Sequence, residues 1–126
     1  MPNITITNND LGGVVLSDAS FRDELLDNFA PKTFSEGTIL ARSASTGNLV
    51  PFETDNDVNT PCAILTYEIT RDNGPISMRA MIAGKVRKER LVIDDGSTID
   101  NIILDQLREY GLVAIDVQEL NFLDNQ

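Results

Sequence analysis

The chain has 126 residues, enough for one domain, and 41% of them are hydrophobic, so it can bury a core without metal or disulfide support. A net charge of -10 excludes the broad basic surface that binding to nucleic acid or to an anionic membrane requires. The single cysteine excludes an internal disulfide, and the N-terminus has no signal-peptide pattern, so we expect synthesis and folding in the cytoplasm.

The N-terminal segment is predicted to be an extended arm. Apolar and polar side chains alternate through residues 3–7, a pattern typical of a strand, and no partner strand follows nearby. Asparagine and glycine residues over positions 8–13 then separate this segment from the rest of the chain. We therefore expect a flexible N-terminal arm over residues 1–16 and a single β-rich domain over residues 17–126.

A short amphipathic helix is predicted after the arm, over residues 17–29. Its apolar side chains recur at helical spacing, and Ser17 or Asp18 can cap its first turn. Pro31 ends the helix, because proline lacks the backbone N–H that a further turn needs. The apolar residues of this face are Phe21, Leu25, Leu26 and Phe29.

The body of the chain is predicted to consist mainly of strands, because aliphatic and β-branched runs alternate with turn residues. The predicted strands cover residues 37–42, 48–52, 61–70, 76–83, 85–93 and 112–117, with a break at Gly84. The first two lie close enough together for a hairpin. A second helix, over residues 99–110, is capped by Ser97 or Thr98, and Gly111 ends it. The fold class we expect is mostly β (α+β): a compact β-rich domain with two short helices and an extended N-terminal arm.

The residues propose no reaction. The chain contains no histidine, which removes the most adaptable general base and the commonest transition-metal ligand. Cys62 lacks a partner that would activate its thiol and lies in an apolar predicted strand, so we interpret it as a buried structural residue. Asp94 and Asp95 precede Gly96 and are interpreted as a turn rather than an acid–base pair. We therefore expect a protein that is not an enzyme.

One polar loop imitates a calcium site. Asp55, Asp57 and Asn59 match the first three ligand positions of a calcium-binding loop. The match then fails, because Thr60 stands where the turn needs glycine and Thr66 where a bidentate glutamate is needed. We therefore expect no metal and no cofactor.

The body contains an ordered set of segments: Phe34–Ala41, Gly47–Phe52 and Pro61–Leu65, then Ala83–Val86 with Arg90 and Leu91, then Ile103–Val113. In order and spacing this set resembles the lambda-type bacteriophage head decoration family. The likeness spans roughly residues 33 to 115, and the ordered set is more specific than any single segment. The helix predicted over residues 17–29 departs from the family pattern.

This resemblance implies a capsid decoration protein, a β-rich homotrimer that binds the major capsid protein on the outer surface of the expanded head and stabilises the virion. Family members carry no catalytic signature, so no active-site residue is implied. We expect the arm to add a strand to an exposed sheet edge of the capsid protein, because its alternating side chains suit such pairing. The expected capsid-binding residues are Asn3, Ile4, Thr5, Ile6 and Thr7.

An acidic DNA mimic that inhibits a nucleic-acid-binding protein is the alternative function, because such a protein is also small, anionic and without catalytic residues. A mimic needs its carboxylates in a surface array at phosphate-like spacing. The acids of this chain are dispersed and often lie in turns and helix starts, which favours the decoration protein. A soluble β-rich domain of some other role is a third possibility. In none of these do we expect nucleic acid or a membrane as the partner.

Overall fold

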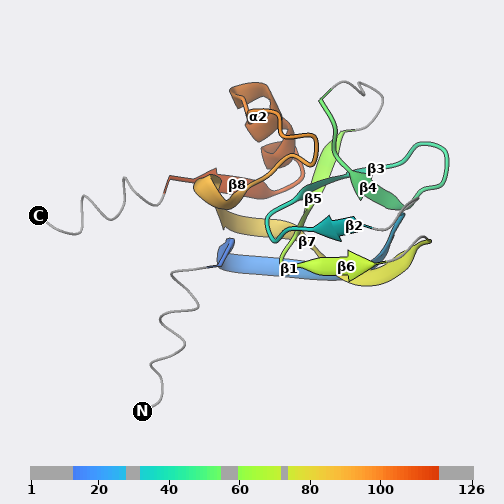
Figure 1. Cartoon of the computed structure of the whole chain (residues 1–126). Helices are drawn as coiled ribbons and strands as arrows, with labels where there is room; N and C mark the ends of the chain where they lie inside the picture. The colour runs from blue at the N-terminus through green and yellow to red at the C-terminus, as the bar shows by residue number, and fades with distance from the viewer. Residues whose placement is uncertain (1–12, 28–31, 55–59, 72–73, 117–126) are drawn as a thin grey trace, which may run out of the picture.

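The computed structural model describes residues 13–27, 32–54, 60–71 and 74–116 (Figure 1). These residues form β1 (Val15–Leu26), β2 (Lys32–Phe34), β3 (Ile39–Arg42), β4 (Leu49–Pro51), β5 (Pro61–Leu65), β6 (Ile69–Arg71), β7 (Ile76–Arg87), the short 3-10 helix η1 (Lys88–Arg90), the α-helix α2 (Asn101–Glu109) and β8 (Leu112–Ile115). The prediction of a mostly β domain is therefore confirmed. Among the described residues there is one α-helix rather than the two that were predicted.

Five strands form a closed ring in the order β1-β4-β3-β5-β7, because β7 also pairs with β1. The pairs are antiparallel except for β1 with β4, which are parallel and meet at Leu26 and Leu49. The antiparallel pair β3 and β4 confirms the predicted hairpin. β8 runs parallel to the last residues of β7, and β2 pairs with β6 in a separate small sheet (Figure 1). The domain is a small barrel with one added strand.

The helix predicted over residues 17–29 is wrong, because Val15–Leu26 form β1. Leucine, glutamate and arginine favour a helix locally, but the 12-residue strand β7 provides β1 with backbone hydrogen bonds from outside the segment. Phe21 and Leu25, which the predicted helix would bury, are 37% and 45% exposed. Only tertiary pairing decides the conformation of this segment.

β7 continues through Gly84, where the sequence predicted a break. Gly84 has a φ of +126°, and a Cβ atom there would lie 2.8 Å from the Ala19 Cα and 2.9 Å from the Asp18 carbonyl oxygen. Asp18 itself has a φ of +58°, and the register between β1 and β7 shifts around it. Glycine is needed at position 84 because β1 bulges directly against β7.

Two further predicted strands differ from the structure. The run over residues 61–70 is divided into β5 and β6, which belong to different sheets. The strand predicted to continue to Ile93 ends at Arg87, where η1 begins. The point at which the chain passes from one sheet to the other could not be predicted, because the residues of β5 and of β6 are equally suited to strands.

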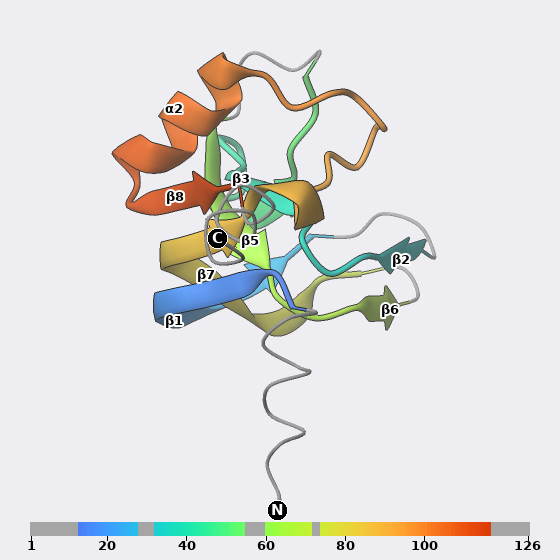
Figure 2. The same cartoon turned by 90° about the vertical axis from the view of Figure 1, so that its left-hand side faces the viewer.

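Helix α2 lies within the second predicted helix, but its cap is different. The Asp100 carboxylate accepts a hydrogen bond of 2.9 Å from the Ile103 backbone N–H, so Asp100 is the N-cap rather than Ser97 or Thr98. The buried residues of α2 are Ile103 and Leu107, whereas Ile102 is 68% exposed. Figure 2 shows α2, β8, β7 and β1 one after another from top to bottom, so the helix covers the end of the sheet that β8 extends.

Two clusters of buried side chains lie on opposite sides of the barrel wall. All five ring strands contribute to the first, which therefore fills the interior: Leu26, Leu40, Leu49, Cys62, Ala63, Leu65, Met78 and Ala80, joined by Phe34 and Ile69. The second lies between the wall and α2 and includes Ile39, Ile64, Met81, Ile103, Leu107 and Leu112. The barrel thus has an aliphatic interior and a helix that covers part of its outside.

Residues 14–16, which were predicted to belong to the arm, are part of the folded domain. Val14 is fully buried, its backbone N–H donates to the Glu36 carboxylate at 3.2 Å, and β1 starts at Val15. Several predicted features lie outside the described residues, namely the arm over residues 1–12 with Asn3, Ile4, Thr5, Ile6 and Thr7, then Phe29 and Pro31, then Asp55, Asp57 and Asn59.

Candidate functional site

The ring of the barrel is closed where β1 pairs with β4, and next to this pair a gap separates β1 from β3. At the closed end, Leu26 pairs with Leu49, and the Asp27 backbone N–H donates to the Leu49 carbonyl at 2.9 Å. β4 begins at Leu49. The β1 residues that precede Leu26 therefore have no described strand between them and β3. We call this opening the barrel mouth; it is lined by Arg22, Glu24, Arg42, Cys62, Ile82 and Tyr110.

Side chains bridge the mouth where backbone pairing stops. The Glu24 carboxylate accepts hydrogen bonds from both terminal nitrogens of Arg42, at 2.7 Å and 3.0 Å. Arg22 donates from its Nε to the same carboxylate at 2.8 Å, and its Nη2 lies 2.5 Å from Oε2. Arg42 also donates to the Gly47 carbonyl at 3.0 Å. A charge-assisted network therefore joins β1 to β3 in place of a strand.

The alternation of side chains along a strand places the charged groups of Arg22, Glu24 and Arg42 next to the apolar interior. Successive side chains of a strand point to opposite faces, so Arg22 and Glu24 share a face with buried Leu26. By the same rule Arg42 shares a face with Leu40, which belongs to the interior cluster. The barrel interior is thus aliphatic at its closed end and charged at its mouth.

A hollow of about 390 Å³ opens at the mouth. Its lining comes from β1, β3, β5, β7 and the end of α2, through Arg22, Arg42, Cys62, Ile82 and Tyr110. Cys62 is 9% exposed, in agreement with its interpretation as a buried residue, whereas Tyr110 is 52% exposed. Barrel mouths with an apolar floor and a few polar groups are common binding positions.

The electrostatics of the mouth follow from its contacts. The hydrogen bonds from Arg42 hold the pKa of Glu24 at about 2, well below its ordinary value of 4.5. The same contact raises the pKa of Arg42, and burial raises the pKa of the Cys62 thiol. At neutral pH the mouth therefore holds two guanidinium cations, one carboxylate and a neutral thiol. Its charge is positive by one in a chain whose net charge is -10.

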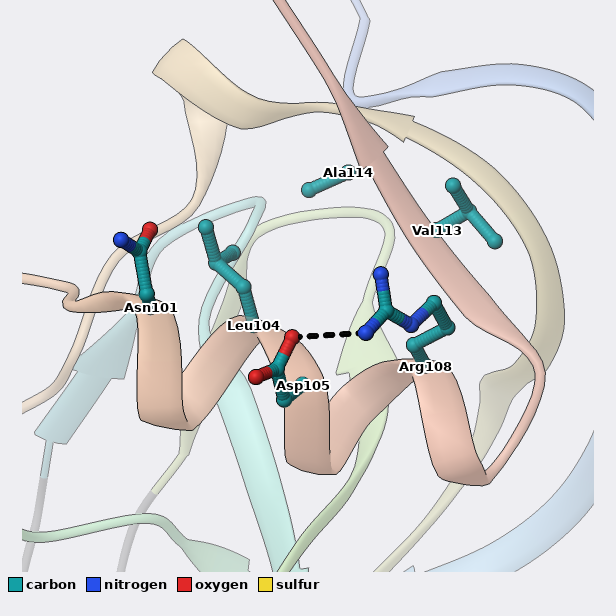
Figure 3. A pocket seen from close by; sticks show the side chains of 6 residues that line it. All are labelled: Asn101, Leu104, Asp105, Arg108, Val113 and Ala114. Atoms are coloured by element: carbon teal, nitrogen blue, oxygen red, sulfur yellow. Dashed lines mark hydrogen bonds and ion pairs between the residues drawn. The ribbon is translucent and has the colours of Figure 1, made fainter.

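A second, smaller hollow of about 200 Å³ lies between α2 and β8 (Figure 3). Its lining residues are Asn101, Leu104, Asp105, Arg108, Val113 and Ala114. Figure 3 shows Arg108 and Asp105 turned toward each other on the helix, and they form an ion pair at 2.8 Å. Because these two charges satisfy each other at an exposed surface, this hollow is the weaker candidate.

The acidic pair singled out in the sequence forms structural contacts. Asp95 accepts hydrogen bonds from the backbone N–H groups of Thr54 and Ser97, at 3.2 Å and 2.9 Å. The Ser97 side chain is the main cause of the lowered pKa of Asp95. Asp94 pairs with Lys32. These contacts hold the segment to Thr54 and to β2 and agree with its interpretation as a turn.

Within residues 13–27, 32–54, 60–71 and 74–116, no group of three acidic or cysteine side chains converges as a metal site would. In the same ranges, no helix combines the length and apolarity needed to span a membrane. We take the mouth as the candidate site because charged side chains from separate strands meet there beside an apolar lining.

Sequence reasoning did not find the mouth. The expected capsid-binding residues, Asn3 to Thr7, lie outside the described residues, so the structure neither joins them to the mouth nor separates them from it. Arg22 and Glu24 stand two positions apart, which puts them on one face of a strand, but the helix prediction hid that spacing. Arg42 is 18 positions from Glu24, and only the arrangement of β1 and β3 brings them together.

No protein-family model, curated protein or solved structure matches this chain.

Proposed function

We propose that this protein is a phage head decoration protein, which binds the outer surface of the expanded shell as a trimer and stabilises it. The observation that carries the proposal is the ordered set of segments that resembles the lambda-type family. These segments fall on neighbouring parts of one structural unit. Three of them supply β3, β4 and β5, which are adjacent in the barrel, and the last supplies α2 and β8.

The segments that carry the likeness also supply core residues, as a likeness that extends over a whole domain requires. Ile39, Leu40 and Ala41 from the first segment are fully buried, as are Ile64 and Leu65 from the third. The helix predicted over residues 17–29 was the one departure from the family pattern. Most of β1 lies in this range instead, so that departure is removed.

The acidic DNA mimic receives less support. A mimic presents free carboxylates, whereas many carboxylates of this chain are engaged within the fold. Asp27 is 5% exposed and accepts hydrogen bonds of 2.9 Å from Thr46 and from Asn48. Glu24 is bound by two arginines, and Asp100 caps α2. Such acids stabilise the domain and leave fewer for a phosphate-like array.

The decisive experiment mixes the purified protein with expanded heads of the phage that encodes it, made without this protein. Cryo-electron microscopy should then show three copies around each local three-fold axis, because three subunits form a closed cyclic set. Unexpanded heads serve as the control and should stay bare. Single copies away from the three-fold axes would refute the proposal, and so would binding to a basic nucleic-acid-binding protein at low salt without any binding to heads.

The proposed docking element is the arm, with Asn3, Ile4, Thr5, Ile6 and Thr7 as its contacts. Deleting residues 2–10 should leave the melting temperature almost unchanged, because the deletion stops short of the fully buried Val14 and of β1. The same deletion should weaken head binding strongly, since three arms per trimer act together. Serine at Ile4 and Ile6 should weaken binding more than serine at Thr5 and Thr7, which is the matched control. Equal binding by the truncated protein would show that the body carries recognition instead.

A further inference from the structure

The mouth has more hydrogen-bond donors than its own residues use. Arg22 donates to Glu24 through Nε and Nη2, so its Nη1 is not engaged by any described residue. Arg42 uses Nη1 twice and Nη2 once, which leaves further N–H groups on the same guanidinium. The side chains of Arg22 and Arg42 are 57% and 38% exposed, so an incoming group can reach these donors.

The hollow behind these donors is partly apolar. Ile82 and the neutral thiol of Cys62 line it together with the two arginines, and Tyr110 stands at the rim. A ligand that suits the hollow therefore combines an anionic head with a short aliphatic stem. The stem displaces water from the apolar lining while the head meets the guanidinium groups.

The charge balance selects a single negative charge. Two arginines and Glu24 leave one positive charge uncompensated, and a monoanion neutralises it. A dianion exceeds that balance and meets repulsion from the Glu24 carboxylate at close range. The planar fork of arginine also fits a carboxylate in a bidentate manner.

We infer that the barrel mouth binds a carboxylate carried on an aliphatic stem, through Arg22 and Arg42, with the stem against Ile82. The source is either a glutamate side chain of a partner protein or a free small carboxylic acid, since both present the same chemistry. This site is independent of the proposed role on the phage head.

The test uses the full chain in solution, with nuclear magnetic resonance of the arginine Nε–H groups and the isoleucine methyl groups. Butyrate should shift the resonances of Arg22, Arg42 and Ile82 in a saturable way, whereas butyramide, its uncharged counterpart, should not. Inorganic phosphate, which has no stem, should bind more weakly than butyrate and leave Ile82 unshifted. A capped tripeptide with a central glutamate then distinguishes the sources. Tighter binding than butyrate indicates a protein side chain, and weaker binding indicates a free acid.

Three substitutions test whether binding occurs at the mouth. Arg22→Gln should weaken butyrate binding about tenfold, because it removes one of two guanidinium groups while the exposed position tolerates the change. Arg108→Gln changes the net charge equally on α2 and should leave binding unchanged. Ile82→Ala removes the apolar contact of the stem and should also weaken butyrate binding, so it keeps the test valid should Arg22→Gln fail to fold. The inference is overturned by equal shifts with butyramide, by phosphate binding as tightly as butyrate, or by equal losses in Arg22→Gln and Arg108→Gln.

Discussion

Two carboxylates near the end of β1, Glu24 and Asp27, stand three positions apart and lie on either side of Leu26, the residue at which β1 pairs with β4. Asp27 lies at the closed end, is 5% exposed and accepts hydrogen bonds from the neutral side chains of Thr46 and Asn48. Glu24 lies at the mouth and is held by two guanidinium groups. Where backbone pairing closes the ring, neutral donors are sufficient for a buried carboxylate. Where pairing stops, opposite charges replace it and remain in contact with water.

The largest expected loss in the free energy of unfolding comes from apolar packing at Leu26, where β1 pairs with β4. Leu26→Ala should lower the free energy of unfolding by about 2–5 kcal/mol, because Leu26 is fully buried at the closing pair and its loss leaves a cavity. Leu25→Ala is the matched control, because Leu25 is the sequence neighbour of Leu26 but is 45% exposed. This variant should lower the free energy of unfolding by about 0.5 kcal/mol or less. Chemical denaturation of both variants measures the difference. Similar losses would contradict the assignment of Leu26 to the interior.

The second effect concerns Gly84 of β7, which faces the bulged part of β1. Gly84→Ala should cost about 2–3 kcal/mol, because its φ of +126° disfavours a side chain and the added Cβ atom would contact Ala19 and Asp18. Gly96→Ala provides the control, since Gly96 has a φ of +82° but no atom within 4 Å of the added Cβ. That variant should lose about 1 kcal/mol. A thermal melt of the pair separates the contact from the backbone strain, and equal melting temperatures would exclude the close approach.

The smallest effect is the charge network at the mouth, and it depends on pH. Glu24 has a folded-state pKa of about 2, below its ordinary value of 4.5, so its stabilisation is complete above about pH 4.5 and is lost as the pH falls toward 2. At neutral pH, Glu24→Gln should cost about 1–2 kcal/mol, less than the pKa shift alone implies because Arg22 and Arg42 are solvent-exposed.

The pH series of this variant has its own control. The stability difference between the wild type and Glu24→Gln should shrink below pH 4.5 and also at high salt. Asp105→Asn removes the same charge from an exposed ion pair on α2 and should change stability by about 0.5 kcal/mol or less. A pH-independent difference for Glu24→Gln would show that packing, not charge, holds the mouth together.

The strands of the body could be predicted from sequence because β3, β4, β5 and β8 are short aliphatic runs bounded by turn residues. β1 could not, because the residues on its inner face include Arg22 and Glu24, so no apolar alternation marks it as a strand. Its apolar residues instead fall at helical spacing by coincidence. The mouth was beyond prediction for a related reason, since Glu24 acquires its partner Arg42 only when the ring has closed.

The pairing of β1 with β7 has a consequence for synthesis on the ribosome. Leu26 pairs with Ile76 and Val15 with Val86, which are 50 and 71 positions away along the chain. β1 leaves the ribosome early but has no neighbour for most of its length until β7 has followed. Proteins dominated by such distant pairings fold slowly, typically in milliseconds to seconds, because the entropy of closing a long loop is lost before the contacts form. The ring can therefore close only after β7 has been synthesised, and any chain that stops before Ile76 leaves β1 without this partner strand.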